Sequence, residues 1–590
     1  MRAVPPWGHR KDVAALPATL ATLGAYAHIR GSADVGEALV RAATAIDPLA
    51  PHERVRLVRR LREHDADVPA PLVPEAANAI RRIIRSGSEV VLAAEAARLP
   101  QDLARLLAVP GVTAAEVLYL HRRFGVVTAA DLAAAATLAG QSATDHEDLA
   151  LHQRLIELLP NLRAGHPRIP LGRAWAIAQD VQHLVASASG AETVLTPVGS
   201  LRRFEPTVGD IELLAQSASP NDAIGAIVRA VAPVQIMHRG ARLATFTVRD
   251  EQVTVRAVPP AEYPFALLYY TGSAVHVRQL QARAADRGWQ LSPAALVAAD
   301  SPQSVACDGE AAIYARLGLQ FVPPERRHGE DEIDAAARQA LAAPIRVEDV
   351  RGDLHVHTLW SDGRDSVEAV AWAARALGYE YVALTDHSPN APASRVMTLD
   401  RLEQRREDIE RARARVPGIR ILEGAEVDIL PDGTLDLPDA ALERLDVVLA
   451  SLHDAAGQSP DQLLERYVAA MQHPLVHIVT HPANRLVGRH EGYLLDYDEL
   501  FAAAARTGTA LEIDGAPAHL DLDGHVARRA AEAGAMLSVN SDCHNVARLG
   551  RQMLFAVGTA RRGGIEARHV LNSRRLDDLL GILQAKRRRA

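Results

Sequence analysis

The stretch Arg351–His387 reads RGDLHVHTLWSDGRDSVEAVAWAARALGYEYVALTDH. We predict a short apolar strand that carries His355 and His357, and Asp362 on the loop that follows it. The two histidines are one residue apart, so their side chains leave the same face of an extended strand. Imidazole nitrogens and carboxylate oxygens on rigid supports are what a metal site needs.

The same arrangement of a strand followed by a donor recurs along the rest of the chain. A helix is predicted from about Ser366 to Leu377, and the strand after it ends in Asp386 and His387. A lone histidine after a strand is more often a capping or packing residue than a ligand, but donors after successive strands favour a metal site at the C-terminal face of a parallel barrel. The nine candidate donors are His355, His357, Asp362, His387, Glu426, His453, His481, Asp542 and His544.

The region from about residue 348 to the end resembles the PHP (polymerase and histidinol phosphatase) domain of metal-dependent phosphoesterases. The resemblance rests on the motifs HVH, TDH, GAE, SLH, THP and SDCH, and it leaves no ligand position empty. It implies a domain over residues 349–590 that folds as a distorted (β/α)7 barrel with three bound metal ions. Mn²⁺, Zn²⁺ and Fe²⁺ all suit histidine-rich sites.

The resemblance also implies how the donors are shared among the three ions. The first ion would take His355, His357, Glu426 and Asp542. The second would share Glu426 and add His453 and His481. The third would take Asp362, His387 and His544.

Clustered divalent ions activate a bound water and stabilise the charge that develops on a phosphate, so hydrolysis of a phosphate ester is expected near Glu426. His355, His357 and Asp542 would complete the catalytic centre. Arg485, which follows His481 in sequence, is a candidate for neutralising the phosphate, with a surface salt bridge as the alternative. We interpret Asp386 as a residue that orients the ligands rather than as a ligand itself.

The length and composition exclude several classes of protein. A chain of 590 residues implies several domains. No apolar run is long enough for a membrane span, and the N-terminus lacks the pattern of a signal peptide. Two distant cysteines give no disulfide framework, so we expect a cytoplasmic protein. The net charge of −8 argues against bulk affinity for polyanions, although a basic surface can exist within an acidic total. We expect a monomer.

Residues 1–160 are predicted to be helical, with one domain over residues 1–90 and a second, fingers-like domain over residues 91–160. The segment 52–65 forms a very basic helix, which is either a solvated face or a phosphate-binding surface. Residues 101–136 have the outline of a helix–hairpin–helix, which binds DNA phosphate through backbone N–H groups. Thr113 stands where a second glycine would let the backbone approach DNA closely, so a structural hairpin is an equal alternative.

Residues 161–335 resemble the nucleotidyltransferase palm and thumb of family X DNA polymerases, and residues 336–348 are predicted to be a linker to the barrel. The resemblance rests on the segment VLTPVGSLRRFEPTVGDIELLAQS. Asp210 and Glu212 lie one residue apart on a strand, so both carboxylates can face the same metal ions. The fold class is therefore multidomain α/β, with a helical N-terminal region, an α+β palm and thumb, and a C-terminal barrel.

The palm departs from the family pattern at positions that matter for nucleotide transfer. Thr254 stands where the family has a third carboxylate, and a neutral hydroxyl is a poor ligand for Mg²⁺. We therefore interpret Asp210, Glu212 and Thr254 as a degenerate polymerase site, with Mg²⁺ as its ion if it still binds one. The candidate nucleotide-binding residues are Gly199, Ser200, Arg203, Tyr270, Gly272 and Ser273.

In bacterial relatives that join these two modules, the PHP domain is a 3′–5′ exonuclease with AP-endonuclease and 3′-phosphatase activities. The resemblance therefore implies a DNA-repair enzyme that acts on gapped DNA or 3′ ends, with polymerase activity weak or lost. One alternative is a gap-filling DNA polymerase that binds a dNTP and also carries a PHP exonuclease. Another is a small-molecule phosphatase of the histidinol-phosphatase type, and a third is a non-enzymatic scaffold.

Overall fold

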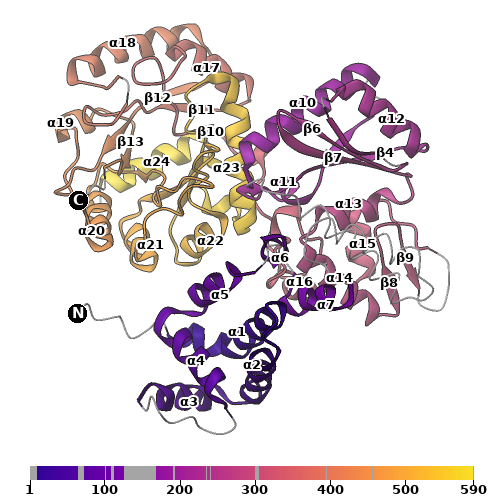
Figure 1. Cartoon of the computed structure of the whole chain (residues 1–590). Coiled ribbons are helices and arrows are strands. Elements are labelled where there is room, and N and C mark those ends of the chain that lie inside the picture. The colour runs from indigo at the N-terminus through magenta and orange to yellow at the C-terminus, as the bar shows by residue number, and fades with distance from the viewer. Residues whose placement is uncertain are drawn as a thin grey trace. The chain divides into compact units, whose positions relative to one another are not determined.

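The computed structural model describes residues 9–63, 72–99, 101–107, 112–124, 168–189, 193–233, 235–239, 241–298, 304–393, 395–454 and 457–588. It divides into two compact units, Met1–Pro167 and Arg168–Ala590 (Figure 1). The finer domain boundaries expected from the sequence remain predictions.

The described part of the first unit consists of helices that bury a shared apolar core. Thr113 accepts a hydrogen bond from the backbone N–H of Glu116 and so begins the last of these helices. The turn residues Pro110, Gly111 and Gly125 of the expected hairpin lie outside the described residues. The helices are α1 (His9–Ile29), α2 (Ala33–Ile46), α3 (Pro51–Glu63), α4 (Pro74–Ser86), α5 (Ser88–Ala96), α6 (Gln101–Leu107) and α7 (Ala114–Phe124).

The second unit begins with the palm, a five-stranded sheet with the strand order β2-β4-β7-β6-β5. Strands β4 and β7 are parallel neighbours and carry Glu212 and Thr254 at paired positions. Asp210 directly precedes β4, so only one of the two carboxylates expected on this strand lies on it. The strands of this sheet are β2 (Leu195–Pro197), β4 (Ile211–Gln216), β5 (Gln235–Arg239), β6 (Leu243–Val248) and β7 (Glu251–Val258). A separate two-stranded sheet pairs β1 (Ile169–Pro170) with β3 (Thr207–Val208). The helices of the palm are α10 (Leu171–Ser189), α11 (Gly199–Arg202) and α12 (Pro220–Val231).

The thumb follows the palm and has its own apolar core, built from helices and a two-stranded sheet. The predicted short helix before the barrel is present as α16, but Ile345 in the expected linker is buried and its N–H bonds to the carbonyl of Ile565. The elements are α13 (Tyr263–Thr271), α14 (Ala274–Ala285), β8 (Trp289–Leu291), β9 (Leu296–Ala298), α15 (Glu310–Arg316) and α16 (Glu332–Ala337).

The barrel has seven strands in sequence order, each paired in parallel with the next. The helices between the strands cover the outside of the barrel, as the resemblance implies (Figure 1). The strands are β10 (Gly352–Asp353), β11 (Tyr381–Leu384), β12 (Arg420–Asp428), β13 (Val447–Ser451), β14 (Ile478–Val479), β15 (Ala510–Asp514) and β16 (Leu537–Asn540). The helices are α17 (Val367–Ala376), α18 (Leu399–Arg415), α19 (Asp439–Leu442), α20 (Pro460–Gln472), α21 (Tyr497–Thr507), α22 (Gly524–Glu532), α23 (Leu549–Gly563) and α24 (Leu576–Arg587).

The first strand differs from the prediction, because β10 ends at Asp353 and does not reach the two histidines. The Asp353 carboxylate accepts hydrogen bonds from the backbone N–H groups of His355 and Ser541, where a regular strand would continue its ladder. A single parallel bridge between Val356 and Cys543 then closes the barrel beyond this point. The predicted helix at about Ser366 to Leu377 is confirmed as α17, with Ser366 as its N-cap.

Asn572 links the first strand of the barrel, β10, to the last strand, β16. Its side-chain amide donates to the carbonyls of Gly352 and Val539 and accepts from the N–H of Val539. Helix α24 then packs Leu579 and Leu583 onto apolar side chains of the strands. The end of the barrel that holds the strand N-termini is thereby covered.

The palm and the barrel share a core within the second unit. Phe555 of α23 is fully buried among palm residues and meets the ring of Trp175 at 5.7 Å. Arg562 on the same helix lies 2.7 Å from the carboxylate of Glu205 in the palm. Helix α23 is therefore part of both modules, and the palm supports the barrel whether or not it transfers nucleotides.

Two expectations that follow from composition can be compared with the structure. Both cysteines, Cys307 and Cys543, are free. Among the helices of the described ranges, none is both long and apolar enough to cross a bilayer.

We predict that Asn572→Ala destabilises the second unit by about 3 kcal/mol, because it leaves buried backbone groups without partners. Chemical denaturation, followed by circular dichroism, measures this change. Asn390→Ala is the control, since Asn390 is exposed, and we expect it to change the unfolding free energy by less than about 1 kcal/mol. Equal stability of both variants would show that Asn572 does not hold the barrel closed.

Candidate metal centre

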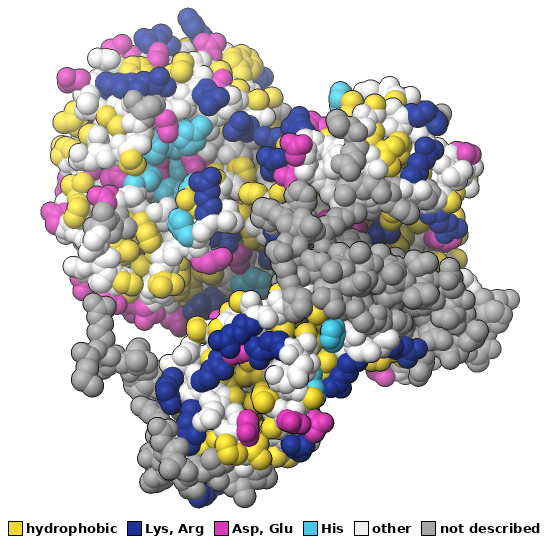
Figure 2. Space-filling model, in the orientation of Figure 1, with side chains coloured by type: hydrophobic (Ala, Val, Ile, Leu, Met, Phe, Trp, Pro, Cys, Tyr) yellow, Lys and Arg dark blue, Asp and Glu magenta, His cyan; other side chains and the backbone are white. Residues whose placement is uncertain are grey.

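The nine predicted donors come together at one end of the barrel. All follow or end strands at their C-terminal ends, where the loops of a parallel barrel meet. Figure 2 shows histidine side chains in cyan beside acidic side chains in magenta at this end. The structure therefore brings together residues that are as much as 189 positions apart in the sequence, from His355 to His544.

Glu426 stands at the centre of the group, with its carboxylate only 1% exposed. Its Oε2 lies 3.4 Å from His355 Nε2 and 2.9 Å from His387 Nδ1. Its Oε1 lies 3.0 Å from His481 Nε2 and 3.5 Å from His453 Nε2. The two oxygens thus face different sets of imidazoles, which is the geometry of a carboxylate that bridges two ions.

The remaining donors form overlapping groups around Glu426. Nε2 of His355 and Nε2 of His357 are 3.0 Å apart, and the latter is 3.1 Å from Asp542 Oδ1. Three sets have donor atoms that all lie within 4.8 Å of one another: His355 with His357 and Asp542; His387 with Glu426 and His453; and His357 with Asp362, His387 and His544.

Bound metal ions would explain the contacts among these residues better than hydrogen bonds between the residues do. Among the described residues, no hydrogen bond of acceptable geometry reaches Glu426 Oε2 or His387 Nδ1, although both atoms are buried. Two imidazole nitrogens at 3.0 Å can share at most one proton. In a cluster of such contacts, several nitrogen and oxygen lone pairs therefore face one another without a proton between them. Buried polar atoms without partners are rare in proteins, and a cation between them would satisfy them all.

The carboxylates also favour positive charge at this end of the barrel. Burial opposes the charged form of His387, yet Glu426 and Asp362 raise the pKa of His387 to about 11. Burial likewise opposes charge on His544, while Asp542 and Asp362 raise its pKa to about 9. Divalent cations would supply the same compensation and compete with these protons.

Two of the donors have strained backbones. His481 has φ of +25° and Asp542 has φ of +48°, where side chains other than glycine are disfavoured. Such strain costs about 1–3 kcal/mol and persists where the surrounding structure holds it, which is frequent at functional sites.

Glu512, which orients two of the predicted ligands, was not predicted from the sequence. Glu512 is fully buried on β15, accepts from the backbone N–H of His481 at 2.9 Å, and lies 2.8 Å from His355 Nδ1. Asn540 donates to the same carboxylate at 2.7 Å. Its place on β15, two residues before Asp514, was the only signal available for it.

Two other carboxylates support the ligands in different ways. Asp428 lies 2.7 Å from His453 Nδ1 and so orients that imidazole directly. Asp386 accepts from Thr358, Ser361 and Arg405 instead, and it reaches His357 only through the Ser361 hydroxyl. The orienting role predicted for Asp386 is therefore indirect.

Asp514 is a further buried carboxyl group in this region. Its Oδ1 accepts from the N–H of Ala516, whereas its Oδ2 has no partner among the described residues. Burial, together with the charges of Asp542 and Glu512, raises the pKa of Asp514 well above its usual value.

Arg485 is buried rather than on the surface. Its Nε donates to the carbonyl of His519, and its Nη1 lies 3.3 Å from Asp523. Its Nη2 is buried and has no acceptor among the described residues. Contact with a phosphate remains a prediction.

The palm brings Glu212 and Thr254 together but offers little for a metal ion there. Glu212 on β4 lies beside Thr254 on β7, whose hydroxyl is 3.2 Å from that of Thr245. Arg256, two residues after Thr254, lies 3.4 Å from Glu212 and stacks on Tyr270 at 4.4 Å. A guanidinium therefore occupies the neighbourhood where a cation would bind.

The predicted nucleotide-binding residues have mixed surroundings. A Cβ built on Gly199 would be 3.3 Å from Glu212, so the Gly199–Ser200 turn does approach the carboxylates. Arg203, however, is largely buried and donates to the carbonyl of Thr271. Ser273 caps α14 and donates to the carbonyl of His328. These roles support the thumb, and nucleotide binding there remains a prediction.

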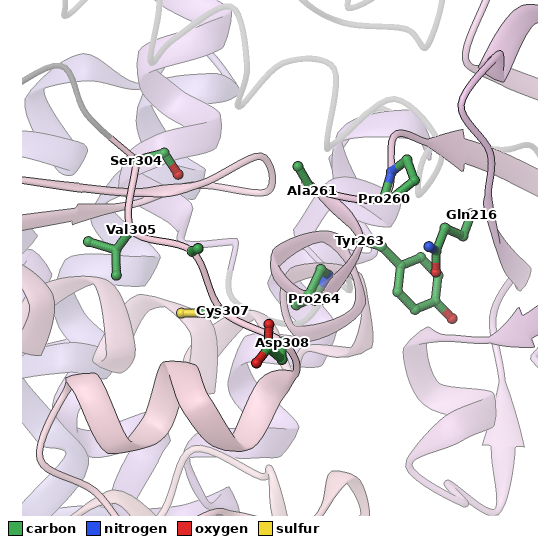
Figure 3. Close-up of a pocket in the computed structure, with 10 residues that line it drawn as sticks. Gln216, Pro260, Ala261, Tyr263, Pro264, Ser304, Val305, Cys307 and Asp308 are labelled. Atoms are coloured by element: carbon green, nitrogen blue, oxygen red, sulfur yellow. The ribbon is translucent and has the colours of Figure 1, made fainter.

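A pocket of about 550 Å³ lies where the palm meets the thumb (Figure 3). It is bounded by the start of α13 and by the segment Ser304–Asp308. Its lining includes Tyr263, Cys307 and Asp308 but no histidine and no pair of acids. We therefore assign the chemistry to the barrel and not to this pocket.

Comparison with known proteins agrees with both modules. Residues 266–328 match the model of the DNA polymerase beta thumb, and residues 353–516 match that of the PHP domain. A probable phosphatase of Syntrophotalea carbinolica is 32% identical over 241 residues, which cover 39% of this chain and 95% of that protein. A probable phosphatase of Thermoanaerobacter sp. (strain X514) is 30% identical over 233 residues, covering 38% and 89%.

One relative covers nearly the whole chain. The DNA polymerase/3′-5′ exonuclease PolX of Bacillus subtilis (strain 168) is 30% identical over 508 residues, which cover 86% of this chain and 88% of that protein. Identity at this level across both modules establishes the family. The chain belongs to the family X DNA polymerases that carry a C-terminal PHP domain.

Proposed function

We propose that this chain is a metal-dependent phosphoesterase that processes DNA 3′ ends in repair, with a 3′–5′ exonuclease in the barrel and weak or no polymerase activity in the palm. The observation that carries the proposal is the convergence of eight donors on a ninth, the buried Glu426. AP-endonuclease and 3′-phosphatase activities require the same phosphate chemistry and are included.

In this proposal the barrel holds three divalent ions, of which Mn²⁺, Zn²⁺ and Fe²⁺ are the candidates. The ions would lower the pKa of a bound water and neutralise charge on phosphate oxygens. Glu426 bridges the first two groups of ligands, Glu512 fixes the orientation of His355, and Arg485 is the candidate contact for the phosphate. The split of Glu426 between two sets of imidazoles supports this assignment.

The palm is proposed to position DNA rather than to extend it. Thr254 supplies no anionic oxygen, and Arg256 already neutralises Glu212. A gap-filling polymerase would need both carboxylates free to hold Mg²⁺ and a third group to accept the primer proton. The shared core around Phe555 gives the palm fold a structural role that does not depend on catalysis.

A phosphatase acting on a small molecule is the second candidate function. It is favoured by the two probable phosphatases, which match this chain over little more than a third of its length. The palm and thumb would then have no use in binding substrate. Hydrolysis of histidinol phosphate at a rate above that of a 3′-phosphorylated oligonucleotide would favour this candidate.

We expect Asp542→Ala to lose bound metal and at least about 10²-fold in the rate of DNA hydrolysis, because it removes an anionic ligand from the centre. Elemental analysis gives the metal content, and 5′-labelled DNA with a free or a blocked 3′ end gives the polarity. Asp523→Ala, which removes the partner of Arg485 and the N-cap of α22 but no predicted ligand, should keep its metal. Full metal content and unchanged hydrolysis in Asp542→Ala would overturn the proposed function.

We expect Glu512→Gln to weaken metal binding about 10- to 100-fold, because the amide can no longer accept from both His355 and the His481 backbone. Competition with a chelating dye measures this affinity. Glu423→Gln is the matched control, since Glu423 is also buried on a barrel strand but bonds to Arg406 at 2.8 Å. Similar losses in both variants would mean that Glu512 does not act on the ligands.

The palm is best tested in the Asp542→Ala background, where hydrolysis cannot hide extension. We expect no measurable primer extension on gapped DNA with Mg²⁺ or Mn²⁺ and dNTPs. Adding Thr254→Asp should raise extension by about 10²-fold or more, because it restores an anionic oxygen beside Glu212. Robust extension without Thr254→Asp would show that the palm is an active polymerase.

A further inference from the structure

Three arginines of the first unit converge on one glutamate. Arg30 follows α1, Arg82 lies on α4 and Arg98 follows α5, so the three come from different helices. Arg82 Nη2 is 2.6 Å and Arg98 Nη1 is 3.3 Å from Glu95 Oε1, while Arg30 bonds to Oε2. We call Arg30, Arg82 and Arg98 the arginine triad.

The triad carries more positive charge than its partner can neutralise. Guanidinium groups stay charged in proteins, so one carboxylate balances only one of the three. The Glu95 side chain is 5% exposed, whereas those of Arg82 and Arg98 are 50% and 66% exposed. The negative charge is therefore covered, and the surplus positive charge faces solvent.

Stability alone does not account for this arrangement. One arginine would suffice to neutralise Glu95, and exposed ion pairs contribute at most about 1 kcal/mol. Glu95 also lies at the C-terminal end of α5, where the helix dipole disfavours an acid. The Glu95 carboxylate does hold the three guanidinium groups close together. Most of their N–H groups do not donate to Glu95 and can donate to another acceptor.

The stretch of sequence that carries the triad is also basic. Residues 1–124 carry 17 Lys and Arg against 13 Asp and Glu, although the whole chain has a net charge of −8. Figure 2 shows Lys and Arg side chains in dark blue gathered on one face of this unit, where Figure 1 places α5. A polyanion is the ligand that such a surface favours.

We propose that the arginine triad binds the phosphodiester backbone of DNA, with Glu95 as the residue that positions it. The proposal deepens the proposed function, since it rests on DNA being the substrate. Arginine forks match phosphate oxygens in bidentate geometry, and contacts of this kind fix the position of DNA without reading its sequence. The first unit would then hold DNA through side chains, independently of any backbone contact from a hairpin turn.

The test is DNA binding by the full chain without divalent ions, so that no hydrolysis occurs. Fluorescence anisotropy with labelled gapped DNA over a series of salt concentrations gives both the affinity and its salt dependence. We expect Arg98→Ala to weaken binding about 5- to 10-fold at low salt and to reduce the slope of log K against log [salt] by about 1.

The chain provides a closely matched control. Arg41 is 68% exposed and pairs with Glu37 one helical turn away, as Arg98 is 66% exposed and pairs with Glu95. The two variants therefore remove the same charge with the same exposure, and only Arg98 belongs to the triad. Equal effects of Arg41→Ala and Arg98→Ala would reduce the triad to general surface charge and overturn the proposal.

Glu95→Gln separates positioning from charge. Removing the negative charge of Glu95 should tighten DNA binding if charge alone matters. If Glu95 positions the three arginines, its loss should weaken DNA binding instead. We expect binding at least about 3-fold weaker, with unchanged helical content by circular dichroism. Tighter binding would remove Glu95 from the proposal as a positioning residue, and Arg98→Ala still tests the triad if this variant does not fold.

Failure of this proposal can be told apart from failure of the proposed function. Hydrolysis of bis-p-nitrophenyl phosphate with Mn²⁺ needs the barrel but no contact with the first unit. We expect Arg98→Ala to hydrolyse it at the wild-type rate. If the wild type lacks this hydrolysis and that of DNA, the proposed function fails. If it has both and Arg98→Ala binds DNA normally, only the triad proposal fails.

Discussion

A carboxylate buried among imidazoles is the constraint on which the second unit depends. Glu426 is almost fully covered and meets five histidines within 3.5 Å. A buried charge is costly unless it is compensated, and the histidines can compensate it only by holding protons or by sharing cations with it. The parallel strands make this possible, because their C-terminal ends deliver donors from distant parts of the chain to one place. The strained backbones of His481 and Asp542 agree with this need to hold the donors close to Glu426.

The two modules of the second unit differ in what they retain. The barrel keeps every donor and the residues that orient them, including Glu512 and Asp428. The palm keeps its sheet and its glycine turn, but Arg256 faces Glu212 where a metal would bind. Helix α23 ties the palm fold to the barrel, because Phe555 lies in the palm core and Arg562 pairs with Glu205. Loss of the palm fold would expose one side of the barrel.

Much of the site could be predicted from the sequence, because the donors follow strands whose apolar residues are easy to recognise. The positions of His387, Glu426 and His453 at strand ends, together with parallel pairing of the strands, were sufficient to predict that these residues lie close together. The interruption of β10 could not be predicted, since it depends on Asp353 replacing a ladder bond with its side chain. Glu512 was missed because an acid on a barrel strand, here two residues before Asp514, does not reveal which side chain it will meet.

The burial of individual side chains was also beyond the sequence. Arg203 fits a motif that binds phosphate in the resembling family, yet here it is covered and bonded to Thr271. The contacts of Arg485 with Asp523 and the His519 carbonyl depend on a loop that returns from a later part of the chain. Such contacts follow from tertiary packing, which local patterns do not specify.

The central claim is that the chemistry belongs to the barrel and that the palm has lost its metal site. The most direct measurement is a crystal structure of the full chain grown with Mn²⁺, with anomalous differences used to locate the ions. The account predicts three peaks among the nine barrel donors, with Glu426 between two of them, and no peak beside Asp210 and Glu212. Manganese at the palm carboxylates and none in the barrel would contradict it.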